Sequence, residues 1–418
     1  LFGKYTIMKI NRNLLKNEGY SNPSLLIKKS YGCYLEDVNG KTFIDTTLGS
    51  GTHILGHNSP IINDAIKQQL DNGILYTTAN NIAYEVAELI SLAYPSNQSV
   101  VFCNSGSEAT MRAARIARAF TRRDKIAIFS GAWHGGNELF MYDHDYKSES
   151  LSAIHKSSGI PESFLENVIV LPYNDEKSFQ IIEDNKDDIA MVIIEPSQGS
   201  NPRDDMFNFL KTLRSVTRRH GIVLCFDEMI TGFRIKYGGC QEYYNVDADL
   251  TTYGKSVGGG LPIGVVAGRS EIVNIIHGSQ KTIPVFMGGT FSANPLVMSV
   301  SKALLEHLLT EKKQIYSYLS KMGDYVKTNV NEHCFKNNID AQVIGIGSML
   351  RIVHTKNFIK SRRERDSLEI GHKIISDFYD SLLKRNIFVN SNKIIFLSMM
   401  HTEDIVNEIT TSIIESIK

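Results

Sequence analysis

Three short segments of the chain combine residue types that could bind and activate a small molecule. Asn104–Thr110 is a turn rich in Ser and Gly, Asp227 and Glu228 follow an apolar run, and Lys255 precedes the glycines at 258–260. Free amide hydrogens at a helix start bind phosphate, and a buried carboxylate pairs with a cationic ring nitrogen. A lysine held in a protected position forms Schiff bases with carbonyl compounds. The three segments therefore indicate phosphate binding, charge pairing and covalent attachment.

Each segment also has an ordinary structural explanation. Ser-Gly-Ser before a helix is a common N-cap, and a carboxylate after a strand often caps the following helix. Most lysines are simply solvated, and Gly-rich turns are frequent in loops. Taken one at a time, these residues leave both interpretations open.

The middle of the chain has the alternating pattern that would hold such residues together. Short apolar, β-branched runs alternate with helical patterns, which predicts a mostly parallel sheet built from β-α units. The expected strands are 100–102, 126–129, 168–170, 191–194, 222–226 and 264–267. Ala113, Ile116, Ala117 and Phe120 recur at helical spacing and predict an amphipathic helix on this sheet. Asp227 would then lie at the carboxyl end of a strand, where open α/β sheets bind ligands.

Two further regions flank this core. Asn39-Gly40 predicts a tight hairpin within residues 32–41. Long helices are expected at 296–309 and 316–331, followed by strand-like runs at 349–353 and 394–397. The expected division is an N-terminal segment, a large α/β domain and a smaller C-terminal α+β domain, at residues 1–60, 61–295 and 296–418.

The composition is that of an ordinary globular protein. The 418 residues include 45 Lys and Arg against 45 Asp and Glu, so there is no basic excess for nucleic acid. The arginine clusters at 112–118 and 362–365 are expected to be solvated helix faces. The five cysteines are scattered without a CxxC pair, which predicts neither disulfides nor a metal site. No signal peptide or membrane span is expected, which favours a cytoplasmic protein. Leu1 is not a natural initiator, so Met8 is expected to be the native start.

The order of these motifs resembles that of a known family. Asn104–Thr110, the run 227–234 (DEMITGFR) and the run 254–264 (GKSVGGGLPIG) resemble the signature of class III aminotransferases. Within the class the chain is most similar to the glutamate-1-semialdehyde 2,1-aminomutase family, notably at 238–244 (GGCQEYY) and 289–295 (GTFSANP). The resemblance covers about residues 25 to 415.

The resemblance implies a fold-type I enzyme that uses pyridoxal 5'-phosphate (PLP) and forms a homodimer with shared active sites. It implies that Lys255 binds PLP as a Schiff base and acts as general base, and that Asp227 pairs with the ring nitrogen. The other implied cofactor contacts are Ser105, Gly106 and Ser107 on the phosphate, Thr290 on the phosphate of the partner subunit, and Trp133 and Met229 on the two ring faces. Glu195, after the run 191–194, would contact the substrate or the cofactor, although a strand-terminal Glu is also a common cap.

Several positions depart from the aminomutase pattern. The segment 22–26 lacks the family's substrate-binding arginine, Ser200 replaces Asn, Lys393 replaces Glu, and 142–150 replaces a Gly-rich gating loop. A substrate carboxylate is usually held by a bidentate arginine, so these changes favour amino transfer between two molecules. Lys393 would then receive a phosphate, a carboxylate or a sugar hydroxyl, unless it is a surface lysine. Intramolecular transfer by an aminomutase remains the alternative, followed by a PLP decarboxylase or epimerase and a non-catalytic homologue.

Overall fold

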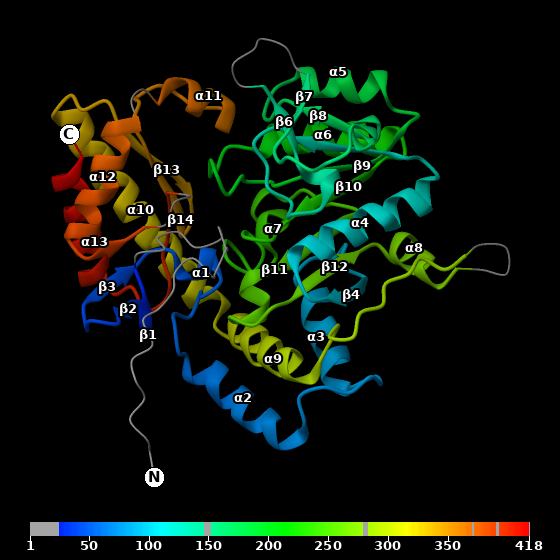
Figure 1. Cartoon of the computed structure of the whole chain (residues 1–418), viewed down its shortest axis with the longest axis horizontal. Helices are drawn as coiled ribbons and strands as arrows, with labels where there is room; N and C mark the ends of the chain where they lie inside the picture. Colours follow the sequence, from blue (N-terminus) through cyan, green and yellow to red (C-terminus); the bar gives the residue numbers. More distant parts are fainter. Residues whose placement is uncertain (1–24, 146–151, 279–282, 370–371, 390–392, 418) are drawn as a thin grey trace.

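The structure is a computed structural model, which describes residues 25–145, 152–278, 283–369, 372–389 and 393–417. A lobe built on a large sheet and a lobe built on a small sheet lie side by side, with α2 (Pro60–Asn72) below them in Figure 1. The sequence expectations on Met8, on residues 22–24 and on 146–150 concern positions outside the described residues.

The large sheet contains seven strands in the order β4-β12-β11-β10-β9-β5-β8. All six expected runs are confirmed as strands of it. The strands are β4 (Ser99–Cys103), β5 (Lys125–Phe129), β8 (Val168–Leu171), β9 (Ile189–Ile194), β10 (Val223–Asp227), β11 (Leu250–Gly254) and β12 (Gly264–Gly268). β11 was not expected from the sequence, because two threonines and a glycine interrupt its apolar pattern.

The sheet is mostly parallel, and β12 is the exception. It pairs antiparallel with both β11 and β4. Only residues 255–263 join β11 to β12, which is too short for the crossover that a parallel pair needs. The main expectation is confirmed, and the reversed strand has a simple topological cause.

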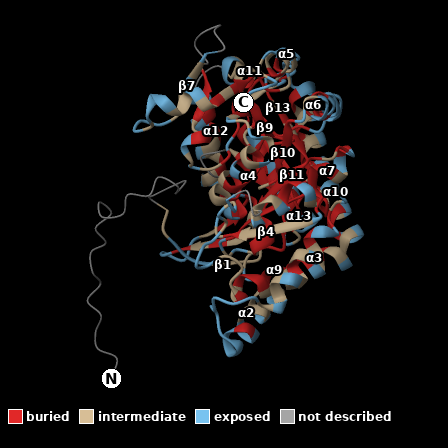
Figure 2. Ribbon diagram, turned by 90° about the vertical axis from the view of Figure 1, so that its right-hand side faces the viewer, coloured by how far each residue is buried: buried red, intermediate tan, exposed pale blue. Residues whose placement is uncertain are grey.

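Helices cover both faces of this sheet. α4 (Gly106–Thr121) buries Ala113, Ile116 and Ala117 on one side, and α6 (Phe207–Arg219) buries Leu210 and Leu213 on the other. Figure 2 shows the buried strands between helices whose outer faces are exposed. The remaining helices of this lobe are α3 (Asn81–Ser91), α5 (Lys177–Asp184), α7 (Gly239–Tyr244) and α8 (Ser270–Val273), and a small hairpin adds β6 (Tyr142–His144) and β7 (Ala153–His155).

The arginine clusters depart from their expected role as solvated helix faces. Arg112 is only 3% exposed and donates to the carbonyl oxygens of Phe102 and Gly288, at 2.9 and 3.0 Å. Arg365 is 4% exposed. That expectation is wrong for both residues, because each guanidinium has carbonyl partners that only the folded chain brings near.

The second lobe contains the C-terminal elements. The expected helices and strands are confirmed as α9 (Pro295–Thr310), α10 (Lys312–Lys336), β14 (Met349–Val353) and β16 (Ile394–Phe396). The structure adds β13 (Gln342–Ile346), α11 (Arg362–Leu368), α12 (His372–Lys384), β15 (Ile387–Phe388) and α13 (Glu403–Ser416). The apolar sides of α10, α12 and α13 share one core with β13, β14 and β16.

The N-terminal strands join this second lobe. β1 (Ile27–Tyr31), β2 (Tyr34–Asp37) and β3 (Thr42–Asp45) form an antiparallel meander. The expected hairpin is confirmed, with Gly40 at φ +84° in its turn. β15 extends the meander by pairing parallel with β3. From β3 the chain enters α1 (Leu48–Gly51) and reaches Thr52, beside the cavity described next.

Candidate active site

A cavity of about 440 Å³ lies where the carboxyl ends of β10 and β11 face the start of α4. It collects residues that are far apart in the sequence. Its lining consists of Thr52, Asn104, Ser105, Gly106, Ser107, Thr110, Trp133, His134, Gly135, Asp227, Met229, Lys255 and 260–263. The three segments that the sequence singled out therefore meet in one cavity, as a site at the strand ends requires.

Asp227 is buried and held on three sides. Its Oδ2 lies 2.7 Å from Nδ1 of His134, and its Oδ1 accepts the hydroxyl of Thr252 at 2.9 Å and the amide of Met229 at 3.1 Å. The residue is 3% exposed. Thr252 is the register partner of Asp227 on the neighbouring strand. This arrangement holds a carboxylate in a fixed direction with little access to water.

Lys255 follows the last residue of β11 and has a left-handed backbone, at φ 39°. Burial lowers the pKa of its ammonium group, while the charges of Asp227 and Glu195 raise it and partly offset that effect. A lowered pKa increases the share of neutral amine, the form that attacks a carbonyl and accepts protons. Lys255 therefore has the electrostatic environment of a nucleophile rather than that of a solvated lysine.

The start of α4 presents its backbone to the cavity. Ser105 is the N-cap and accepts the amide of Glu108 at 3.2 Å, while the hydroxyl of Ser107 accepts the amide of Gly136 at 3.0 Å. A Cβ at Gly135 would lie 2.4 Å from Oγ of Ser107, so the two loops approach too closely for a side chain. Ser105 is thus a cap, as the ordinary interpretation expected, at a 16-residue helix whose dipole favours an anion.

Trp133 and Glu195 form a connected pair. Trp133 lines the cavity with 58% of its surface exposed, and its backbone amide donates to Oε1 of Glu195 at 2.8 Å. Oε2 of Glu195 accepts the amide of Gly199 at 2.8 Å. Both oxygens of Glu195 are thus engaged by backbone groups, and burial raises the pKa of this carboxyl. Glu195 holds the loop that carries Trp133.

Four residues from the sequence expectations lie outside the cavity lining, namely Glu195, Ser200, Thr290 and Lys393. Ser200 donates to the carbonyl of Gly131 at 3.2 Å, and Lys393 lies 5.8 Å from the ring centroid of Tyr379. Thr290 is exposed, in a segment that Arg112 holds through the carbonyl of Gly288. Within the described residues, no group of three or more His, Cys, Asp and Glu side chains could hold a metal ion, and no helix is long and apolar enough to span a membrane.

Sequence reasoning assigned no role to several residues of the site. His134 and Thr252 position Asp227, and Thr52 and Thr110 line the cavity. Thr110 also donates to the carbonyl of His134 at 2.7 Å. The only sequence signal for His134 was its place next to Trp133. Thr252 had none, because its role depends on the pairing of β10 with β11.

Comparisons with known proteins agree with this geometry. The aminotransferase class-III family matches residues 15–387. The glutamate-1-semialdehyde 2,1-aminomutase of Methanosarcina acetivorans is 36% identical over 410 residues, covering 96% of this chain and 95% of that protein. The same enzyme of Methanococcoides burtonii is 37% identical, with 92% of each chain covered.

Solved structures give the same fold. An omega-transaminase from Sphaerobacter thermophilus has a TM-score of 0.87 at 29% identity, over 94% of this chain and 90% of that chain. A glutamate-1-semialdehyde aminomutase from Pseudomonas aeruginosa has a TM-score of 0.83 at 19% identity, over 94% and 87%, and supports the fold alone.

The fold and the site define a fold-type I enzyme that depends on PLP. The chain belongs to the class III aminotransferase family. The residues present fit the cofactor, because a buried carboxylate, a lysine of lowered pKa and a helix start free of bulky side chains face one cavity. At Gly106 a Cβ would lie 2.9 Å from Sδ of Met229, so this cradle has no room for larger residues.

Proposed function

We propose that this enzyme transfers an amino group from one molecule to another. The meeting of Lys255, Asp227 and the start of α4 in one cavity supports amino transfer, and the lack of an arginine in residues 22–26 favours transfer between two molecules. When bound, PLP supplies an electron-accepting ring that stabilises negative charge on the carbon next to the transferred nitrogen. The structures similar to this chain at 28–29% identity include the omega-transaminase and a β-phenylalanine aminotransferase from Variovorax paradoxus.

Each residue of the cavity has a role in this proposal. Nζ of Lys255 binds the cofactor covalently and, once released, moves a proton to or from the substrate carbon. Asp227 keeps the ring nitrogen protonated, and His134 and Thr252 hold Asp227 in place. Ser105, Gly106 and Ser107 bind the phosphate, and Trp133 and Met229 enclose the ring. Glu195 positions Trp133 through its amide.

Intramolecular transfer remains the second candidate, because curated relatives at 33–37% identity are glutamate-1-semialdehyde 2,1-aminomutases. Against it stands the absence of an arginine in residues 22–26. The catalytic residues of the cavity serve both reactions equally well. Only the fate of the amino group separates the two.

The test is a single half-reaction. Purified enzyme is mixed with L-glutamate, and cofactor absorbance and 2-oxoglutarate are measured in the same sample. Loss of the Lys255-linked band with an equal amount of 2-oxoglutarate supports transfer between molecules. A band that no amino donor changes, together with turnover of glutamate-1-semialdehyde, would contradict it.

A second copy of the chain would complete the site. Ile283, Phe286 and Phe291 are 92%, 74% and 58% exposed, and Arg115 holds this segment through the carbonyl of Phe286 at 2.7 Å. An exposed apolar segment of this kind is typical of a subunit interface. Thr290 would then reach the phosphate bound by the partner subunit. Sedimentation of wild type and Phe286→Asp tests this, since only the wild type is expected to be a stable dimer.

The proposed location is the cytoplasm. All five cysteines are free and buried, as expected for a protein of a reducing compartment. Thiol titration of enzyme purified from its native host under alkylating conditions should return five reduced cysteines, and a disulfide would contradict this location.

A further inference from the structure

Two cations with unused hydrogen-bond donors flank the loop that leads to Trp133. Lys156, just after β7, donates to the carbonyl of Ala132 at 2.7 Å and lies 5.7 Å from the ring centroid of Trp133. No carboxylate of the described residues lies within 4.0 Å of its Nζ. An ammonium group carries three donors, and Lys156 uses one of them, on a neutral carbonyl.

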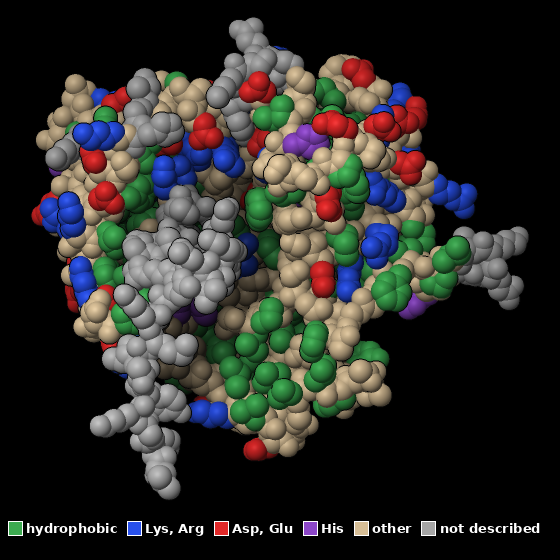
Figure 3. Space-filling model, viewed as in Figure 1, with side chains coloured by type: hydrophobic (Ala, Val, Ile, Leu, Met, Phe, Trp, Pro, Cys, Tyr) green, Lys and Arg blue, Asp and Glu red, His purple; other side chains and the backbone are tan. Residues whose placement is uncertain are grey.

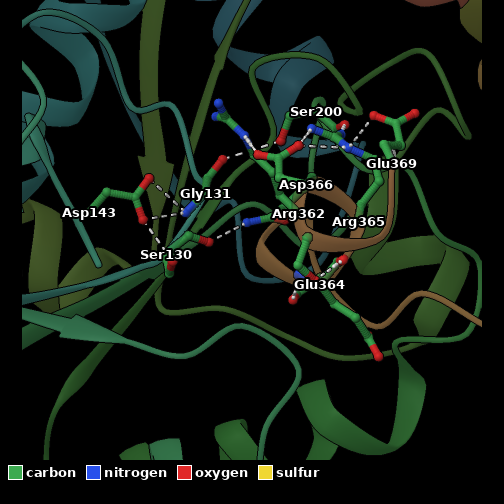
Figure 4. Close-up of polar contacts among 12 residues, drawn as sticks. Ser130, Gly131, Asp143, Ser200, Arg362, Glu364, Arg365, Asp366 and Glu369 are labelled. Carbon is green, nitrogen blue, oxygen red and sulfur yellow. Dashed lines mark hydrogen bonds and ion pairs between the residues drawn. The ribbon is translucent and has the colours of Figure 1, made fainter. Parts of the chain in front are cut away.

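Arg362, the first residue of α11, packs against the same loop at Gly131, one residue further from Trp133. A Cβ at Gly131 would lie 2.9 Å from Cβ and 3.2 Å from Cδ of Arg362. Only Nε is engaged, by Asp366 at 3.3 Å, and the two terminal nitrogens have no partner in the part of the chain that the structure describes. Figure 4 shows Arg362, Arg365 and Asp366 of α11 beside Gly131 and Ser200.

The carboxylates near these cations are occupied elsewhere. Asp143 accepts the amide of Gly131 at 3.1 Å and the hydroxyl of Ser130 at 2.7 Å, and Glu195 accepts two other amides. Burial lowers the pKa of Lys156, Arg362 lowers it further, and Asp143 and Glu195 raise it. In Figure 3, Lys and Arg side chains gather at the hollow between the lobes, below α11. Lys156 and Arg362 thus repel each other, and a bound anion would offset this repulsion.

We propose that Lys156 and Arg362 bind a distal anionic group of the substrate, a carboxylate or a phosphate, on the Trp133 side of the cofactor cavity. The idea rests on the proposed amino transfer and names the substrate class. Ala132 and Gly131, which the two cations contact, directly precede Trp133 in the chain, and Trp133 lines the cavity. Neighbouring Cα atoms are about 3.8 Å apart, so Ala132 and Gly131 lie only one and two residues from the cavity residue Trp133. A substrate whose anionic group is a few bonds from its reacting carbon is long enough to reach them.

The first test compares donors that differ only in distal charge. L-glutamate is compared with L-glutamine, and O-phospho-L-serine with L-serine, as kcat/KM for conversion of the cofactor. The reverse half-reaction is measured with 2-oxoglutarate and pyruvate. The wild type should prefer the anionic member by about 10-fold or more, and the pair with the larger preference tells a carboxylate from a phosphate. No preference in either direction of the reaction would overturn the subsite.

The variants test the two cations. Lys156→Met and Arg362→Met should each reduce the preference by about 10- to 100-fold, mainly through KM, whereas Lys156→Arg should retain most of it. Lys67→Met is the matched control, since Lys67 is an exposed lysine paired with Asp64 on α2. Because the readout is a ratio, general damage to the loop cancels. Equal losses with charged and neutral donors would contradict the proposal.

A binding measurement separates the subsite from the proposed reaction. Trp133 is the only tryptophan of the chain, so the intrinsic fluorescence of the holoenzyme reports on this loop. Titration with glutarate or inorganic phosphate should change the emission saturably in the wild type and at least about 10-fold more weakly in Lys156→Met. If no donor of any charge converts the cofactor, the proposed reaction fails, but saturable binding still supports the subsite. No saturable binding of either anion overturns it.

Discussion

The charged side chains on the two sides of the cofactor cavity differ in how many hydrogen-bond partners they have within the chain. On the side of β10, Asp227 has three partners within the chain, and Glu228 next to it accepts the amides of Cys240 and Gln241 at 2.7 and 2.9 Å. On the side of Trp133, Lys156 and Arg362 keep donors unused. A carboxylate with fixed partners, such as Asp227, suits a chemical step that is the same for every substrate. Hydrogen-bond donors without partners, as on Lys156 and Arg362, suit the binding of an anionic group on the substrate. The comparison therefore separates the residues of the reaction from those of specificity.

The largest effect is expected from Lys255→Ala. Loss of both the covalent attachment and the proton carrier should reduce transamination by roughly 10⁴-fold with every donor, whatever its charge. Cofactor absorbance and product formation measure this. If Lys255→Ala lost activity with anionic donors alone, Lys255 would act in substrate selection and not in the step common to all donors.

Arg365→Leu probes how the Trp133 side is held in place. The side chain of Arg365 is buried, donates to the carbonyl of Ser200 in the other lobe and pairs with Glu369 at 3.5 Å. Removing one member of a buried ion pair should lower the free energy of unfolding by about 3 kcal/mol. Arg385→Leu, which breaks an exposed pair with Glu415, should cost less than about 1 kcal/mol. Denaturant unfolding compares the two variants. Equal losses of unfolding free energy would show that the contacts of Arg365 do not stabilise the packing of α11 between the lobes.

Asp227→Asn tests the side of β10 without adding bulk. The amide cannot hold the ring nitrogen protonated, so kcat/KM should fall by about 10²- to 10³-fold for charged and neutral donors alike. The preference for anionic donors should stay as in the wild type. A change in that preference would mean that Asp227 also affects the binding of the distal anionic group, so that reaction and specificity would not be separate.

The sequence predicted the charged residues on the β10 side of the cavity but not the two cations on the Trp133 side. Asp227 and Lys255 stand at the ends of apolar or Gly-rich runs, and their order along the chain is itself a signal. Lys156 and Arg362 carry no such signal, because they follow β7 and begin α11, and only the folded chain brings both to Gly131 and Ala132. Arg362 was even expected to be solvated together with Arg365. Strand order and burial were needed to see what these residues face.

The same limit applies to Ser105, whose cap role and phosphate role the sequence could not separate. Ser105→Ala removes the acceptor for the amide of Glu108 and should lower the free energy of unfolding by about 1 kcal/mol. Thr402→Ala removes a similar cap at α13, far along the chain from the cavity lining, and should cost about the same. If Ser105 also binds the phosphate, only Ser105→Ala should weaken the affinity for PLP, measured by reconstitution of the cofactor-free enzyme. Equal PLP affinity in the two variants would leave Ser105 as a cap, and phosphate binding on the β10 side would then rest on the helix start and Ser107.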